Sequence, residues 1–422
     1  MCTHTRAAGH TRAFVLIAAL PVIVFLTSAP ARADDAVMEW NQIALAATVT
    51  AGQGPIPQIR TMAIVQVSVH DAVNAITCDY RTYLPIHCGR WGAPDAAAIA
   101  AAHRALAGLL PAQAQALDQA RAASLAAHGL SDRSPGVAFG EAVAAVILAI
   151  RSNDGAAQAQ FPYTAPGAGT PGVWVPVGPA APATPGWGKV RPWVVHQLWP
   201  FQPAGPPPLH SRRYARDYNE VKELGALTSP SRTDEQTNIA RFWLAPPSVI
   251  WNGVARQAIQ AEGLNQSATA RTFALLYLAA ADASIVCWDT KYTVNFWRPI
   301  TAIQHGDADD NERTDADPAW APLFPTPQHP EYISGHSTNS AAMATVLILL
   351  FGDKADAPIV ATSPTNPGFE RHWATFTEGI EEVMDARVYS GIHFRSANED
   401  GAQAGRKVAR FVVNDALRDR TR

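Results

Sequence analysis

Apolar residues recur at helical spacing through most of the chain, in runs that proline and glycine separate. In the first half the spacing predicts helices at 37–49, 59–76, 96–110, 112–127 and 135–152. In the second half it predicts helices at 212–227, 234–243, 249–262, 268–296, 337–351, 376–389 and 400–417. No sequence repeat or sustained heptad accompanies these runs. The pattern therefore predicts an all-α fold of packed helical bundles.

A long connector interrupts the helical pattern at residues 155–210. It is rich in proline and glycine and holds four tryptophans, and this aromatic content favours an ordered loop over a disordered linker. The pattern thus divides the chain into an N-terminal helical part at 34–154, the connector at 155–210 and a C-terminal helical bundle at 211–422.

Residues 1–33 have the pattern of a signal peptide. Arg6 and Arg12 precede an uncharged apolar run at 13–26, and Ala31-Arg32-Ala33 has the small-x-small form of a cleavage site. The run is shorter than the roughly 20 residues of a membrane span, and we find no other segment long and apolar enough to span. We therefore predict a secreted or periplasmic protein that has no membrane contact after signal removal.

Charge and cysteine content narrow the function classes. Without residues 1–33 the chain has 30 basic and 36 acidic residues, a formal net charge of −6, which argues against nucleic-acid binding. Cys2 leaves with the signal peptide, while Cys78 and Cys88 bracket a short segment and are predicted to form a disulfide in an oxidising compartment. Cys287 lies in an apolar run and is predicted to be a buried free thiol. These cysteines cannot build a metal-thiolate site.

Two clusters in the C-terminal half carry residues suited to an anion. Ser334-Gly335-His336 stands directly before an apolar helix, and a helix start offers unpaired N–H groups that small residues let an anion approach. Lys291 and Arg298 are seven residues apart, so a continuous helix would direct both cations from one face before Pro299 ends it. An N-cap and a solvated basic face are the ordinary alternatives.

A third cluster places Arg387 six residues before His393. We expect Gly391 to interrupt the helix, so that His393 turns back towards the same site. Alone, this cluster would favour a helix C-terminus whose cations complement the dipole. The three clusters together supply one Lys, two Arg, two His and a Ser-Gly helix start, an inventory that suits a tetrahedral oxyanion.

The three clusters resemble the signature of the vanadium-dependent haloperoxidases and of the acid phosphatases in the same superfamily: Lys291-x6-Arg298-Pro299, Ser334-Gly335-His336 and Arg387-x5-His393. The likeness spans residues 288–393 and implies a vanadium haloperoxidase-like helical fold. It implies that His393 is the axial ligand of vanadate, or the nucleophile of a phosphatase, and that His336 is the acid–base residue. The oxyanion would be held by Lys291, Arg298, Ser334, Gly335 and Arg387.

Three positions depart from the family's pattern. Ile333 stands where the family often has proline, and Ala386 where it often has serine. Ala397 replaces the aspartate that follows the axial histidine by four residues, and such a carboxylate would orient the ring and raise its basicity. We expect Glu399, Asp400 or a backbone carbonyl to take its place.

Two further residues favour a peroxidase. Trp288 resembles the halide-pocket tryptophan of the chloroperoxidases, and His329 resembles a histidine found in bromoperoxidases; core packing and loop surface are the respective alternatives. We predict a secreted haloperoxidase that oxidises bromide or iodide with hydrogen peroxide at vanadate. Lys291 would polarise the peroxide, and His336, with His329, would move protons.

Two other function classes stay open at this point. One is an exported acid phosphatase that forms a phosphohistidine at His393, and the other is a non-catalytic helical binding protein. The expected partners are small molecules: hydrogen peroxide, a halide and an organic acceptor. The sequence decides neither the halide, the acceptor nor whether the chain forms a homo-oligomer.

Overall fold

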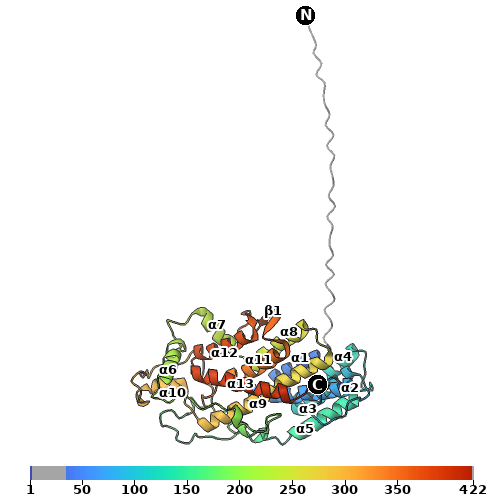
Figure 1. The fold of residues 1–422 in the computed structure, drawn as a ribbon, viewed down its shortest axis with the longest axis horizontal. Helices are drawn as coiled ribbons and strands as arrows, with labels where there is room; N and C mark the ends of the chain where they lie inside the picture. Colours follow the sequence, from blue (N-terminus) through green and yellow to red (C-terminus); the bar gives the residue numbers. More distant parts are fainter. Residues whose placement is uncertain (2–34, 421–422) are drawn as a thin grey trace. The chain divides into compact units, whose positions relative to one another are not determined.

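The computed structural model describes Met1 and residues 35–420, except for the side chains of 355–357. Residues 35–420 fall within one compact unit, drawn as the coloured ribbon in Figure 1. Apart from Met1, the predicted signal peptide at 1–33 lies outside the described residues. The part boundaries predicted at 154 and 210 stay a prediction from the sequence.

Five helices form the N-terminal part: α1 (Ala36–Thr50), α2 (Pro55–Thr77), α3 (Pro94–Leu109), α4 (Ala114–Ala127) and α5 (Val137–Arg151). The Asp35 side chain caps α1 by accepting the N–H of Met38. Proline opens α2 and α3, where its missing N–H costs no helical hydrogen bond. The α2 helix packs against α3 and α5, so that it is buried along most of its length.

Eight helices form the C-terminal part: α6 (Arg212–Leu224), α7 (Asp234–Phe242), α8 (Pro247–Ala261), α9 (Gln266–Val294), α10 (Pro299–Gln304), α11 (Gly335–Phe351), α12 (Phe376–Tyr389) and α13 (Arg395–Asp415). The long helix α9 lies at the centre and packs against α2, α11 and α13 (Figure 1). Its contact with α2 joins the N-terminal helices to the site-bearing bundle. The predicted all-α fold is confirmed.

Two details of the predicted helices are wrong. The helix expected at 268–296 ends at Val294, because Asn295 takes a left-handed conformation (φ 53°). Arg298 is then the N-cap of the separate helix α10, and Pro299 begins that helix instead of ending α9. Lys291 and Arg298 therefore do not share one helix face.

The sequence pattern also missed a short antiparallel hairpin. Strands β1 (Lys354–Ala361) and β2 (Arg371–Thr375) pair between α11 and α12. Strand β2 has only five residues, one of them buried, and the sequence of neither strand alternates clearly between apolar and polar residues along its whole length.

By length and composition, α9 could cross a membrane, which contradicts the expectation that no segment beyond 1–33 could do so. In this structure 94% of its most apolar window is buried within the fold. The core helix of a helical protein shows the same composition, because it is surrounded by other helices on every side.

The connector is ordered and contains short 3-10 turns at Ala156–Gln158, Trp187–Lys189 and Trp199–Phe201. Three of its four tryptophans, Trp174, Trp187 and Trp193, are buried, whereas Trp199 is exposed. The N–H of Trp174 donates to the carbonyl of Asn295, directly after α9 (2.8 Å). The connector is thus fastened to the element that carries Lys291.

Cys78 and Cys88 are free thiols in this structure, so the predicted disulfide is not formed. The two side chains are nevertheless neighbours, because a hydrogen bond to Cys88 is the main cause that raises the pKa of Cys78. Cys287 is a buried free thiol, as predicted.

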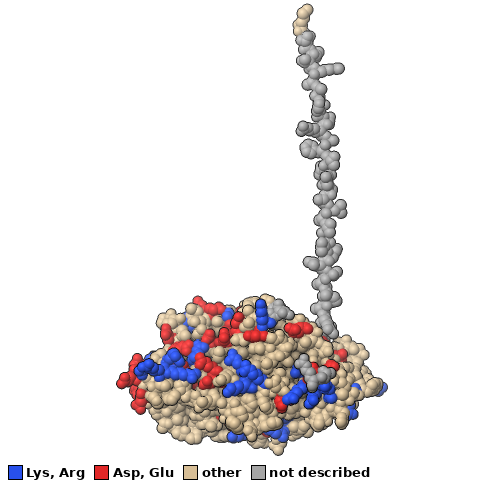
Figure 2. Space-filling model, in the orientation of Figure 1, with Lys and Arg blue, Asp and Glu red and all other residues tan. Residues whose placement is uncertain are grey.

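On the face shown in Figure 2, acidic and basic side chains lie among one another.

Candidate active site

The three sequence clusters meet where α9, α10, α11 and the α12–α13 turn approach one another. Ser334 is the N-cap of α11, and its hydroxyl oxygen accepts the N–H of Ser337 (3.4 Å). The Oγ of Ser337 lies 3.1 Å from the Ser334 hydroxyl and 3.0 Å from Oδ1 of Asn398, which is an acceptor for its single proton. Gly391 adopts a left-handed φ of 77° between α12 and α13, and this turn brings His393 back beside Arg387, as predicted.

Two buried cations are held by main-chain carbonyls. The Lys291 ammonium donates to the carbonyl oxygens of Pro330 (2.8 Å) and Glu331 (2.9 Å), and the Arg387 guanidinium donates to that of Trp243 (2.8 Å). Burial lowers the pKa of Lys291 to about 7 and that of Arg387 to about 9. Within the described residues, the buried Nε of Arg387 has no hydrogen-bond partner.

Arg298 connects the loop before α11 with the turn before α13. Its Nε donates to the carbonyl of His329 (2.9 Å), and its Nη1 donates to the carbonyl of Ile392 (2.8 Å). The two terminal nitrogens also face ring nitrogens, Nε2 of His393 at 3.2 Å and Nδ1 of His329 at 2.8 Å. The guanidinium is fully buried, and burial lowers its pKa to about 10.

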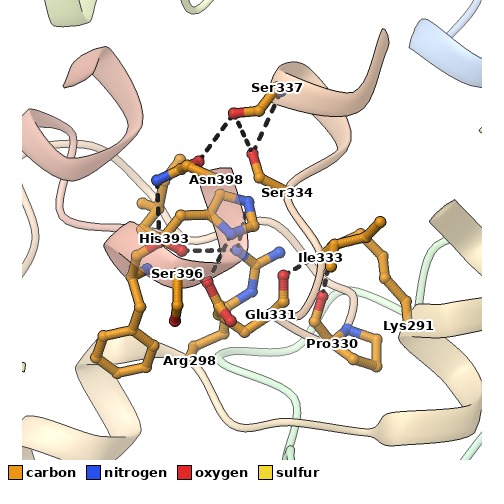
Figure 3. A network of polar contacts seen from close by, with 12 residues as sticks. Lys291, Arg298, Pro330, Glu331, Ile333, Ser334, Ser337, His393, Ser396 and Asn398 are labelled. Atoms are coloured by element: carbon orange, nitrogen blue, oxygen red, sulfur yellow. Dashed lines mark hydrogen bonds and ion pairs between the residues drawn. The ribbon is translucent and has the colours of Figure 1, made fainter. Parts of the chain in front are cut away.

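A buried carboxyl group orients His393, as Figure 3 shows. The Nδ1 atom of His393 lies 2.8 Å from Oε1 of Glu331, which also accepts the N–H of Phe394 (3.0 Å). Since Nε2 faces an N–H of Arg298, we assign the ring proton to Nδ1. Burial, followed by the nearby cations, lowers the pKa of His393 well below its usual value. The ring is thus neutral, with the Nε2 lone pair at the cationic end.

Sequence reasoning missed Glu331. It was also wrong to expect Glu399, Asp400 or a backbone carbonyl to orient the ring of His393 in place of the aspartate that is missing at Ala397. Asp400 instead accepts the hydroxyl of Tyr332 (2.8 Å), and Glu399 pairs with Arg213 (3.1 Å). The sequence did offer one sign of its role: Glu331 is an acidic residue three positions before Ser334, in the loop that leads into α11. A buried carboxyl group needs partners, and here these are the ring and the backbone of the axial-histidine turn.

A cavity of about 360 Å³ opens at this cluster. All three predicted parts of the chain line it, which the sequence did not indicate for the N-terminal part or the connector. The N-terminal part supplies 54–57, the connector supplies Gln160, Ala183 and Thr184, and the C-terminal part supplies Trp288, Gln328, His329, Gly335, His336, Asn339, Arg387 and His393, among others.

His336 lines this cavity, and its buried ring nitrogen Nε2 has no hydrogen-bond partner in the part of the chain that the structure describes. Burial, followed by the charge of Arg387, lowers the pKa of His336 well below its usual value. A neutral histidine with an open nitrogen can accept a proton and return it.

Trp288 and His329 form one wall of the cavity. Their ring centroids lie 5.1 Å apart, and the Lys291 ammonium lies 5.8 Å from the indole. The indole also covers Gly335, where an added Cβ would lie 3.1 Å from the ring. The wall is therefore aromatic, with the buried ammonium of Lys291 close to it.

The arrangement suits an oxyanion better than a metal ion. Among the described residues, no group of three or more His, Cys, Asp and Glu could hold a metal ion. Three buried cations, the Ser334 hydroxyl and the first N–H groups of α11 converge instead, next to the neutral Nε2 of His393. Such donors neutralise and orient the oxygens of a tetrahedral anion, while the lone pair can bond to its central atom.

Comparisons with known proteins agree with this geometry. Residues 271–420 match the family model of the VCPO second helical-bundle domain. The vanadium chloroperoxidase of Curvularia inaequalis is 27% identical over 266 residues, which are 51% of this chain and 43% of that protein. The crystal structure of the first bacterial vanadium-dependent iodoperoxidase has a TM-score of 0.78 at 26% identity and covers 92% of this chain and 98% of its own.

A further solved structure, of a holo-type bacterial vanadium-dependent chloroperoxidase, shares the fold. Its TM-score is 0.66 at 19% identity, and the match covers 86% of this chain and 92% of that one. The fold and the site thus define a member of the superfamily of vanadium-dependent haloperoxidases and related acid phosphatases. Within it, residues 271–420 are similar to the VCPO second helical-bundle domain.

Proposed function

We propose that this protein is a vanadium-dependent haloperoxidase that oxidises iodide or bromide with hydrogen peroxide. The observation that carries the proposal is the neutral His393, whose Nε2 lone pair faces the buried cations beside an open cavity. The haloperoxidase names of the similar proteins support the same reaction class. The iodoperoxidase among them favours iodide.

The residues of the site fit vanadate as the cofactor. His393 would bond to vanadium through Nε2, while Lys291, Arg298, Arg387, Ser334 and the Gly335 N–H would hold the oxygens. The buried, unpartnered Nε of Arg387 supports this fit, since such a donor requires an acceptor. Bound vanadate would supply the Lewis acidity that activates hydrogen peroxide towards a halide.

The other side chains move protons and exclude water. His336 would take a proton from hydrogen peroxide at its open Nε2 and return it to the departing hydroxide. The ammonium of Lys291 would stabilise negative charge on oxygen, because main-chain carbonyls orient it without cancelling its charge. Trp288 and His329 would limit the water around the halide.

We also propose that the chain works outside the cytoplasm, on the signal-like pattern of residues 1–33. An acid phosphatase is the second candidate, since the same cations and Nε2 would suit a phosphoryl group. We favour the haloperoxidase over the phosphatase because Trp288 and His329 give the cavity a wall suited to a polarisable halide.

The test compares both reactions on one preparation. Metal-free protein is loaded with orthovanadate and assayed for triiodide and tribromide formation with hydrogen peroxide, and the unloaded protein is assayed with a phosphomonoester. We expect halide oxidation that vanadate restores, phosphate blocks and His393→Ala abolishes. If no halide is oxidised while the unloaded protein cleaves phosphomonoesters efficiently, the phosphatase is the function.

A further inference from the structure

A second cavity shares Trp288 with the oxyanion cavity. It has a volume of about 330 Å³, and its walls come from the connector and the last turns of α9. Four aromatic side chains line it, together with an ion pair and an exposed threonine: Phe161, Tyr163, Trp288, Tyr292, Lys189, Asp289 and Thr293. The mechanism described above uses none of these residues except Trp288.

The main-chain segment 183–186 divides the two cavities. Ala183 and Thr184 line the oxyanion cavity, whereas Pro185 and Gly186 line the second one. The carbonyl oxygen of Ala183 accepts the hydroxyl of Tyr292 (2.7 Å) and the indole N–H of Trp288 (3.3 Å). This segment is therefore a fixed partition, and the two cavities lie on either side of it and share Trp288.

The lining of the second cavity indicates an aromatic ligand. Tyr163 and Tyr292 pack edge to face, with centroids 5.0 Å apart, and such rings offer edges and faces for a further ring. Phe161 is 42% exposed at this cavity, which leaves a large apolar surface without cover. The cavity volume lies within the range of ligand pockets, roughly 300–1,000 Å³.

A hydrogen-bond acceptor stands at the same cavity. One carboxylate oxygen of Asp289 accepts the amide of Gln202 (2.6 Å), and the other lies 3.4 Å from the ammonium of Lys189. A carboxylate has about four acceptor positions, so it can accept one more donor. A ring that carries an O–H or N–H group matches both features of this cavity.

We infer that the second cavity binds the organic acceptor, an electron-rich aromatic ring with an O–H or N–H group, such as a phenol or an indole. The inference rests on the proposed function, which supplies hypohalous acid as the reagent. A ring C–H bond and the halogen–oxygen bond break, while a carbon–halogen bond and an O–H bond of water form. The ring is oxidised by two electrons and the halogen is reduced by two, so no further reagent is required.

Binding is tested first, without the cofactor. The dissociation constant of phenol is measured by saturation-transfer NMR on the wild-type chain and on Thr293→Trp, which fills the cavity from an exposed position. Phe161→Ala removes one ring at the rim, and Trp91→Ala removes an exposed ring that does not line the cavity.

We expect phenol to bind about tenfold more weakly to Thr293→Trp and several-fold more weakly to Phe161→Ala, with no change in Trp91→Ala. Sulfate affinity at the oxyanion site should stay unchanged in all three variants, which shows that the fold is intact. The absence of phenol binding to the wild type, or wild-type affinity in Thr293→Trp, overturns the inference.

Product distribution is tested second, on the vanadate-loaded protein. Phenol is iodinated by the wild type, by Thr293→Trp and by reagent hypoiodous acid, and the ortho-to-para ratios are compared. We expect a distinct ratio for the wild type and the reagent ratio for the variant, while triiodide formation without phenol is equal in both. A reagent ratio for the wild type overturns the inference. A lack of triiodide in every variant refutes the proposed function instead, and the phenol-binding result still stands by itself.

Discussion

Replacing Glu331 by glutamine should separate the stability of this protein from its function. The carboxyl group is completely buried, and its Oε1 accepts both the Nδ1–H of His393 and the N–H of Phe394. The amide oxygen of glutamine can accept the same two donors. The substitution therefore preserves the ring's position and removes the capacity of residue 331 to carry negative charge, while it places an amide NH2 at the buried Oε2 position, which has no hydrogen-bond partner among the described residues.

The expected gain in stability follows from the pKa of Glu331. Burial raises this pKa from 4.5 to about 8, so the carboxyl group favours the folded state most below pH 4.5, and this contribution is lost as the pH rises to about 8. A shift of this size corresponds to at most ~5 kcal/mol. Because glutamine does not titrate, Glu331→Gln should become more stable relative to the wild type between pH 4.5 and 8.

The expected loss is in oxyanion binding. A carboxylate partner strengthens the donor ability of a ligating histidine, and substitution of such partners typically costs about 10–100-fold in affinity or activity. We therefore expect Glu331→Gln to bind vanadate about 10–100-fold more weakly at pH 9, where the wild-type carboxyl group is ionised, while its melting temperature at pH 8 rises. Glu331→Ala is the matched comparison, because it leaves the Nδ1–H unpaired and should lower both quantities.

Calorimetric titration with vanadate and thermal melts from pH 5 to 9 measure the two effects. Wild-type vanadate affinity in Glu331→Gln would show that the carboxyl group does not tune His393. A difference in melting temperature that does not vary with pH would show that the carboxyl group titrates normally and that its burial has no energetic consequence.

Three further outcomes are expected. The affinity for sulfate, whose own charge is constant from pH 5 to 9, should fall between pH 7 and 8 by up to about tenfold, because Lys291 (pKa about 7) loses its charge first. A flat profile would refute this order, and Lys291→Met should remove most of the slope in that interval, since Glu331 (pKa about 8) and Arg387 (pKa about 9) titrate at higher pH. His336→Ala should lower halide oxidation by at least ~100-fold yet leave sulfate affinity within a few-fold, since the ring is neutral; equal losses in both would make His336 a binding residue. Gly335→Ala should weaken sulfate binding measurably, because the new Cβ displaces the Trp288 ring that lies 3.1 Å away; unchanged affinity would mean that the indole moves freely.

Sequence patterning predicted most of the helices because their apolar faces are long. Helix α10 was missed because six residues are too few to show a helical repeat of apolar positions. The hairpin of β1 and β2 was missed because apolar and polar residues alternate only weakly along its strands. The end of α9 was misplaced because nothing in the composition near Asn295 forbids a helix. Asn295 takes its left-handed conformation next to Phe296, which pairs with Val173 of the connector, and this tertiary contact cannot be read from the local sequence.

The site was predictable as an inventory but not as a geometry. Residue types and spacing identified the cations, both histidines and the helix start. The role of Glu331 depends on the loop before α11 lying against the turn before α13, a contact between segments about 60 positions apart in the chain. The walls supplied by 54–57 and 183–184 likewise depend on tertiary packing, which no local pattern encodes.

Main-chain carbonyls hold all three buried cations, and this has a consequence for how such a site can evolve. The carbonyls belong to His329, Pro330, Glu331, Ile392 and Trp243. A carbonyl is supplied by every amino acid, so at Pro330, Ile392 and Trp243 the bond itself places no demand on the side chain. Mutation can therefore alter these three positions while the cations keep their places, as long as the backbone path survives. An oxyanion site built this way is inherited as a backbone shape with a few fixed charges, and it can persist in sequences that have otherwise diverged widely.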